Sequence, residues 1–222
     1  YASTSDLFGQ QGGLMQGYMM PRSNQKLDDY TQVSYGSGVI ISQDGLIITN
    51  NHVISSGSKV SVTLSDGTQY EAKILGQDES SDLAVLKIEA TNLKAVSIGS
   101  SKDLQVGQSV VAIGNPLSEE FSQTVTNGII SGVNRKLKAD NQSFSLIQTN
   151  AAINSGNSGG ALVDSNGKLI GINTAKISAE GVEGIGFAIP IDEAMTIVQE
   201  LVDKGSIEHA YIGFSGYLLT EE

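Results

Sequence analysis

Short apolar runs separated by turn-forming residues dominate the chain from residue 37 onward. The runs at residues 38–42 (GVIIS) and 46–50 (LIITN) flank an Asp-Gly turn, which is typical of a β-hairpin. The run at residues 59–64 (KVSVTL) alternates apolar and polar positions as a half-buried strand does. Further strand-like runs follow at residues 68–75, 82–88, 109–114 and 125–134. This pattern predicts a closed or nearly closed antiparallel barrel.

A second series of runs follows Gly114-Asn115-Pro116. It comprises residues 144–150, residues 161–177 around an Asn-Gly hairpin, and residues 185–190. Two barrels fit this better than one sandwich, although periodicity alone does not distinguish them. We assign the first barrel to residues 34–113 and the second to residues 114–190. Surface loops are expected where strand patterning is lacking, at residues 117–123, 134–143 and 175–185.

One helix is predicted over residues 191–205. Acidic residues follow Pro190, Lys204 and Gly205 close the segment, and apolar residues recur between them at helical spacing. The resulting apolar stripe is Met195, Val198, Leu201 and Val202. It predicts a helix docked on the second barrel.

The two ends of the chain carry no such periodicity. Residues 1–33 are rich in Gln, Gly and Ser, which predicts an N-terminal loop or arm. Its candidate contact patch is Met15, Tyr18, Met19 and Met20, with a partly disordered tail as the alternative. Residues 206–222 are expected to be a linker toward something outside this chain.

Composition describes a globular chain and excludes several classes of partner. Of the 222 residues, 39% are hydrophobic and 17% charged, and no run approaches the ~18 apolar residues of a membrane span. The net charge of -11 argues against nucleic acid and against an anionic membrane surface. Cysteine is absent, and His52 and His209 are the only histidines, so no metal site is expected.

The stretch Gly156-Asn157-Ser158-Gly159-Gly160 places one hydroxyl among residues of high backbone freedom. Glycines on both sides of a serine leave room for a substrate carbonyl and let successive N–H groups point one way. An acyl-transfer nucleophile needs this arrangement, but a plain glycine-rich turn would have the same composition. The stretch alone leaves both interpretations open.

His52 and Asp82 each lie at a strand boundary, where loop-mounted polar groups can converge. Singly, each also fits a structural role. Together with Ser158 they follow the chain order His, Asp, Ser of the chymotrypsin-type triad. The nucleophile elbow of α/β-hydrolases also matches Gly156-x-Ser158-x-Gly160, but a hairpin follows where a helix is required, and only His209 lies late in the chain.

Residues 36–214 resemble the HtrA/DegP family of trypsin-like serine proteases. The resemblance rests on GSGVIIS, TNNHVI, LSDG, SDLAVLKI, VGQSVVAIGNP, TVTNGIISGVNR, IQTNAAINSGNSGGALV, GKLIGINTA and GIGFAIP, in family order and spacing. It implies an all-β fold of two six-stranded antiparallel β-barrels of the trypsin/chymotrypsin type, with a cleft between them and a C-terminal helix.

The same resemblance implies the roles of the candidate residues. Ser158 would attack the peptide carbonyl, His52 would take and return the proton, and Asp82 would orient the histidine. Backbone N–H groups of Gly156, Asn157 and Ser158 would form the oxyanion hole. No cofactor and no metal take part.

The residue six before the nucleophile lies at the base of the specificity pocket in trypsin-like proteases, and here it is the neutral Ala152. Cleavage after small or medium apolar residues is therefore expected, with pocket walls from Ile153, Ile185 and Phe187.

Two asparagines depart from relatives. Asn157 replaces the aspartate that pairs with a newly cut N-terminus in digestive relatives, so control by loop rearrangement is expected instead. Asn150 replaces an aspartate that many relatives carry, which puts a carboxylate role there in doubt.

The family implies a bacterial cell-envelope or extracellular endopeptidase of protein quality control that acts on unfolded or misfolded polypeptides. It also implies a homotrimer and a PDZ domain in the full-length chain, which residues 210–222 would precede and this chain lacks. The rival interpretation is a chaperone-like polypeptide-binding module with a latent or inactive protease site.

Overall fold

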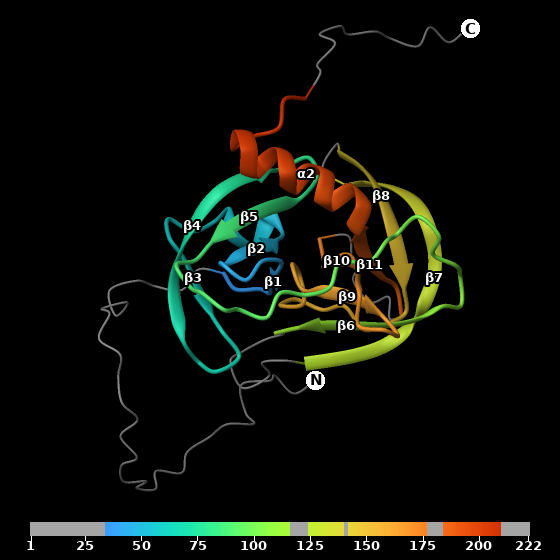
Figure 1. Ribbon diagram of the computed structural model, residues 1–222. Helices are drawn as coiled ribbons and strands as arrows, with labels where there is room; N and C mark the ends of the chain where they lie inside the picture. The colour runs from blue at the N-terminus through green and yellow to red at the C-terminus, as the bar shows by residue number, and fades with distance from the viewer. Residues whose placement is uncertain (1–33, 116–123, 140–141, 177–183, 210–222) are drawn as a thin grey trace, which may run out of the picture. The chain divides into compact units, whose positions relative to one another are not determined.

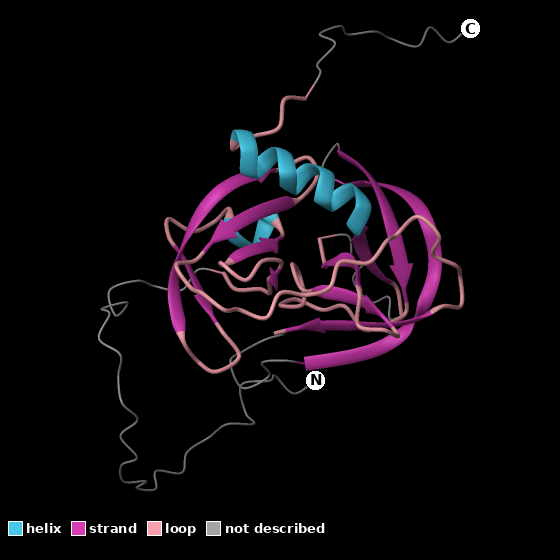
Figure 2. Cartoon of the chain, viewed as in Figure 1, coloured by secondary structure: helices cyan, strands magenta, loops and turns pink. Residues whose placement is uncertain are grey.

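The computed structural model describes residues 34–115, 124–139, 142–176 and 184–209. These belong to one compact unit, Gln32–Glu222, and are mostly strand (Figure 1, Figure 2). The proposed N-terminal contact patch and the expected loop at residues 117–123 lie outside the described residues. No helix in the described ranges is long and apolar enough to cross a membrane. The elements are β1 (Val39–Ile40), β2 (Leu46–Thr49), α1 (Asn51–Ile54), β3 (Val60–Thr63), β4 (Gln69–Asp78), β5 (Leu83–Lys87), β6 (Ser109–Gly114), β7 (Thr124–Ala139), β8 (Gln142–Thr149), β9 (Ala161–Asp164), β10 (Leu169–Thr174), β11 (Gly186–Pro190) and α2 (Ile191–Lys204).

The first sheet has five antiparallel strands in the order β1-β2-β5-β4-β3. A closed or nearly closed barrel of six strands was expected here, and the described residues form a half-barrel of five strands. β1 is only two residues long and pairs with β2, while β3 pairs with β4, so both remain edge strands within the described part. A register shift between Ile74 and Gly76 lets β4 curve from one neighbour to the other, as bulges do.

The second sheet closes into a six-stranded antiparallel barrel in the order β10-β11-β8-β7-β6-β9. β6 pairs with β7 and β9, although the sequence prediction assigned residues 109–113 to the first barrel. β6 thus belongs to the second barrel, and the chain passes from one sheet to the other earlier, in residues 88–108.

The prediction of a loop at residues 134–143 is wrong for most of that range. β7 and β8 continue through residues 134–139 and 142–143 as a long paired hairpin. The hydrogen bonds between paired strands use backbone groups, so a polar segment that contains lysines can also form strands. Its sequence lacks the alternation of apolar and polar residues from which strands are predicted. The Asn-Gly hairpin between β9 and β10 is confirmed, with Gly167 at φ +73° and its N–H 3.0 Å from Asp164 O.

Three apolar clusters fill the molecule. One lies within the half-barrel around Ile47 and Leu86, and a second within the closed barrel around Ile147 and Leu162. The third and largest joins residues of both sheets with α2. The two sheets are therefore joined by a shared apolar core.

Helix α2 covers the junction of the two sheets (Figure 1). Val198 and Leu201 of the predicted stripe are buried, together with Ile191 and Ala194. Met195 is half-buried, and the inclusion of Val202 is wrong because Val202 is 38% exposed. The helix contacts β10 and β11, which confirms the expected docking on the second barrel, and it also contacts β4 and β5 of the first sheet. The helix ends at Gly205, whose φ of +80° makes a left-handed cap and whose N–H lies 2.9 Å from Leu201 O.

This packing predicts that Leu201→Ala destabilises the protein by about 2–5 kcal/mol, because the Leu201 side chain has no exposed surface and leaves a cavity at the junction. Urea unfolding measures the effect. The neighbouring Val202→Ala is the control, since Val202 is 38% exposed and its truncation should cost no more than about 0.5 kcal/mol. Equal destabilisation by both variants would contradict the proposed packing role of the helix.

Candidate active site

Asp82 lies in the turn between β4 and β5 and is 1% exposed. Its φ of +56° is a left-handed conformation that non-glycine residues rarely adopt, so its surroundings must hold it there. The Asp82 carbonyl accepts hydrogen bonds from Asn50 Nδ2 at 2.9 Å and from Asn51 N at 3.1 Å. These bonds join the Asp82 turn to the segment that carries His52.

His52 lies on α1, a four-residue helix directly after β2 that the sequence pattern did not predict. His52 Nδ1 is 2.8 Å from Asp82 Oδ2, and the backbone N–H of His52 donates to Asp82 Oδ1 at 3.0 Å. Thr174 Oγ1, at the end of β10, donates to Asp82 Oδ2 at 3.2 Å. With Asp82 ionised its oxygens only accept, so Nδ1 carries the hydrogen and Nε2 of a neutral ring is free to accept a proton.

Ser158 is 3% exposed and lies in the turn before β9. Its Oγ accepts a hydrogen bond from Ala175 N at 3.0 Å. No hydrogen bond joins Ser158 Oγ to His52 among the described residues. Because a hydroxyl has one hydrogen and two acceptor positions, the bond from Ala175 leaves the hydrogen of Ser158 available to a base.

The backbone N–H groups of the predicted oxyanion hole are not all available to a substrate. Gly156 takes a φ of +98°, and Asn157 N donates to Asn154 O at 2.9 Å. The Asn157 N–H is therefore occupied within the loop. In the described part of the chain, the N–H groups of Gly156 and Ser158 have no protein acceptor, so these two predicted donors remain available for an oxyanion.

Ser37, which precedes β1 of the half-barrel, binds the loop that contains Gly156 and Ser158. No role of Ser37 was predicted from the sequence. Its Oγ donates to Gly156 O at 2.6 Å and its N–H donates to Ser158 O at 2.8 Å. Its own carbonyl accepts Thr49 Oγ1 at 2.7 Å. The only sequence signal for Ser37 was its place in the GSGVIIS motif.

The residues predicted to form the specificity pocket are only partly brought together. Ile153 packs against Gly186, where an added Cβ would lie 2.6 Å from Ile153 Cγ1. Ala152 is exposed, and Ile185 is 44% exposed beside Gly186. Phe187, by contrast, belongs to the cluster shared by both sheets, whereas Ile153 packs on the cluster inside the closed barrel.

Both departing asparagines have structural partners. Asn150 Oδ1 accepts the N–H of Ile129 at 2.7 Å, a role that needs an acceptor oxygen and no charge. Asn157 is 1% exposed, and its Nδ2 donates to Ala152 O at 3.2 Å. The amide thus links the loop before the nucleophile to the predicted pocket base.

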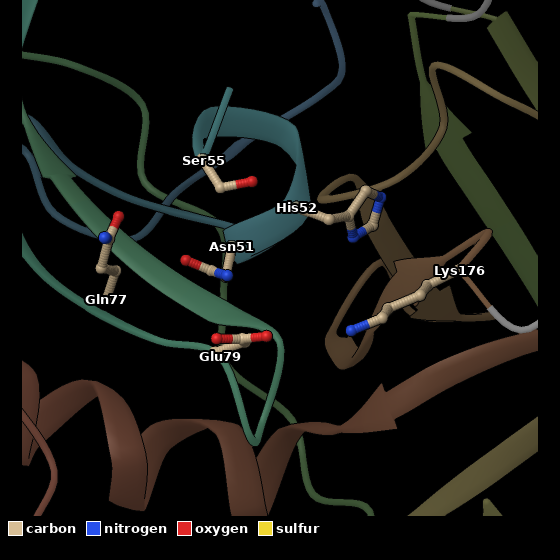
Figure 3. A pocket seen from close by; sticks show the side chains of 6 residues that line it. All are labelled: Asn51, His52, Ser55, Gln77, Glu79 and Lys176. Atoms are coloured by element: carbon tan, nitrogen blue, oxygen red, sulfur yellow. The ribbon is translucent and has the colours of Figure 1, made fainter. Parts of the chain in front are cut away.

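An open pocket of about 430 Å³ adjoins His52 (Figure 3). Its lining comes from α1 on one side and from the end of β4 on another, with Lys176 extending in from the segment after β10. The lining residues are Asn51, His52, Ser55, Gln77, Glu79 and Lys176. The lining is polar and includes one acidic side chain, Glu79, and one basic side chain, Lys176.

The described residues contain no group of three or more His, Cys, Asp or Glu side chains placed to hold a metal ion. His52 contacts Asp82, and His209 contacts Asp78, so each described histidine has a carboxylate partner. The chemistry available at this site is that of a hydroxyl, an oriented imidazole and backbone donors.

The sequence matches the model of the trypsin-like peptidase domain over residues 36–172. The chain is 47% identical over 201 residues to the serine protease Do-like HtrA of Bacillus subtilis (strain 168), covering 87% of this chain and 45% of that protein. It is 45% identical over 181 residues to a probable periplasmic serine endoprotease, DegP-like, of Hahella chejuensis (strain KCTC 2396), covering 81% and 38%. The chain therefore spans less than half the length of these curated relatives.

Solved structures agree with this result. The HtrA-type protease AlgW with decapeptide superimposes with a TM-score of 0.76 at 45% identity, covering 83% of this chain and 57% of that one. A serine endoprotease from Yersinia pestis gives a TM-score of 0.74 at 44% identity, covering 87% and 65%. The chain belongs to the trypsin-like peptidase family, and its homologues within that family are the HtrA/DegP serine proteases.

Proposed function

We propose that this chain is a serine endopeptidase that cleaves unfolded or misfolded polypeptides through a Ser-His-Asp acyl-enzyme mechanism. The observation that carries the proposal is the 2.8 Å contact between His52 Nδ1 and Asp82 Oδ2. The loop of Ser158 adds two available backbone donors. Nucleophilic catalysis by a serine requires an oriented imidazole as base and donors for the oxyanion.

Reaction begins when the Ser158 hydroxyl turns its hydrogen toward His52 Nε2 and its oxygen attacks the peptide carbonyl. His52 takes the proton, and the Asp82 carboxylate stabilises the imidazolium through Nδ1. The proton then passes to the leaving amine, so the C–N bond breaks and an acyl-Ser158 ester remains. Water then enters, gives a proton to His52 and attacks the ester carbon. The bond between that carbon and Ser158 Oγ breaks, the carboxylic acid leaves, and His52 returns the proton to Ser158 Oγ.

Two backbone N–H groups, those of Gly156 and Ser158, stabilise the oxyanion in this proposal. The Ser37 hydroxyl holds the carbonyl of Gly156 at 2.6 Å, which helps to fix the orientation of that loop. A donor of this kind contributes about 3 kcal/mol to transition-state stabilisation in measured cases. Loop rearrangement at Gly156 is the corresponding route to an inactive state.

The proposed setting is the bacterial cell envelope or the extracellular space, in line with relatives named as periplasmic serine proteases. A homotrimer and a PDZ domain in the full-length protein are proposed from the same family. For specificity we propose an uncharged pocket with Ala152 at its base. Ile153, Ile185 and Gly186 form its walls, and Phe187 is left out because it packs in the cluster shared by both sheets. The packing of Ile153 against Gly186 supports this choice.

Removal of the proposed nucleophile or its orienting acid should abolish cleavage. Ser158→Ala should reduce casein cleavage to background, and Asp82→Asn should lower kcat by about 10⁴-fold because the histidine loses its correct tautomer. Gel-based casein cleavage and initial rates on a peptide substrate measure these effects. Asp164→Asn, at the end of β9 and next to the β9–β10 turn, is the matched carboxamide control and should keep full activity.

The rival interpretation predicts a different outcome. A chaperone-like module with a latent site would show the same negligible cleavage in the wild type and in Ser158→Ala, while both would still suppress aggregation of an unfolded protein. That result would exclude the protease proposal for this chain.

The neutral pocket base predicts that Ala152→Asp shifts cleavage toward Lys and Arg at the residue before the scissile bond. A carboxylate there offers an ion pair to a basic side chain and an unpaired charge to an apolar one. We expect the ratio of kcat/KM for basic over apolar peptides to rise by at least about tenfold. Matched peptide pairs measure it.

Asn154→Asp is the control, because it adds the same charge two residues closer to the nucleophile on an exposed side chain. An equal shift in both variants would show a general electrostatic effect and would contradict the assignment of Ala152 to the pocket base.

A further inference from the structure

The side chain of Asp78, the last residue of β4, binds the turn that carries Asp82. Asp78 is 8% exposed, and its Oδ2 accepts the N–H of Ser81 at 2.9 Å and the hydroxyl of Ser80 at 3.0 Å. Within the same turn, Asp82 N donates to Glu79 O at 3.2 Å. The carboxylate of Asp78 therefore fixes the backbone that places Asp82 in its left-handed conformation.

His209, after the end of α2, binds this carboxylate from outside the turn. His209 Nε2 lies 2.7 Å from Asp78 Oδ1 and 2.7 Å from Ser80 Oγ. Ser80 gives its hydrogen to Asp78, and an ionised carboxylate only accepts, so His209 Nε2 carries the hydrogen in this arrangement. Burial acts to raise the pKa of Asp78, but hydrogen bonds from Ser81, His209 and Ser80 outweigh it and hold the pKa below its ordinary value.

The path of the chain explains why His209 reaches this position. The end of α2 packs directly on the curved part of β4, where a Cβ at Gly76 would lie 2.8 Å from Gly205 O and 2.9 Å from Leu201 O. Two residues further along β4 is Asp78. The segment 205–209 thus leaves the helix beside the base of the catalytic turn.

We propose that Asp78 is a positioning residue for Asp82, and that His209 couples the segment after α2 to the catalytic acid through it. The inference rests on the proteolytic activity proposed above. Asp82 is held on one side by Asn50 and Asn51 and on the other by the turn that begins at Asp78. Release of His209 loosens only the second side, so it changes the orientation of His52 without touching substrate.

Four variants test the proposal in the full chain. Asp78→Ala and His209→Ala should lower kcat by about 10- to 100-fold with little change in KM, because misplacement of a catalytic group costs rate rather than substrate binding. His209→Gln should restore most of kcat, since a glutamine amide can supply an N–H donor near the position of Nε2. Asp78→Asn should be intermediate, because it keeps one acceptor oxygen.

Asp66→Asn is the matched control. Asp66 also holds a turn of the half-barrel, accepting Thr68 N at 2.9 Å, but its turn joins β3 to β4 and carries no catalytic residue. It should leave kcat unchanged. Equal loss of kcat in Asp66→Asn and Asp78→Asn would show general destabilisation and overturn the proposal.

A second readout separates this inference from the proposed activity. The hydrogen between His52 Nδ1 and Asp82 gives a low-field proton NMR signal that does not require turnover. The signal should broaden or vanish in Asp78→Ala and His209→Ala and persist in His209→Gln and Asp66→Asn. If the wild type is inactive but the signals follow this order, the protease proposal fails and the coupling stands. An unchanged signal and unchanged kcat in His209→Ala would overturn the coupling.

Discussion

The buried carboxylate of Asp82 is the constraint on which the site depends. A carboxylate that is 1% exposed needs hydrogen-bond donors, and the protein supplies them from two different sheets. His52 donates through its ring and its backbone from the half-barrel side, and Thr174 donates from β10 of the closed barrel. Satisfying this one group therefore aligns both halves of the molecule and orients the imidazole at the same time.

The apolar core makes that alignment possible. Each sheet has an interior cluster of its own, but the largest cluster contains residues of both sheets and of α2. A helix that packs on β4, β5, β10 and β11 restricts movement of one sheet against the other. The apolar packing behind the site thus limits the movement of the residues that make its polar contacts.

The sequence was sufficient to predict most strands and α2, because alternation, helical spacing and turn residues are local signals. Chain order and the family motifs also predicted the pairing of His52 with Asp82, whose side chains lie 2.8 Å apart. The sequence was insufficient where long-range contacts decide. The role of Ser37 arises only when its hydroxyl meets Gly156, 119 positions away, and Thr174 is one more polar strand residue until it reaches Asp82. The strands through residues 134–139 and the half-barrel depend on backbone pairing, for which side-chain patterns give no signal.

The loop after the nucleophile has no spare volume. A single Cβ atom at Gly159 would collide with the carbonyl oxygen of Ser37 and with Thr49 Oγ1, and one at Gly160 would collide with Ile113 O. These obstacles come from the segment before β1, from β2 and from β6, so no one of them can be relieved by a local change. A larger residue at Gly159 or Gly160 would therefore require changes in these distant segments at the same time. Single substitutions at these two positions should rarely be tolerated during evolution.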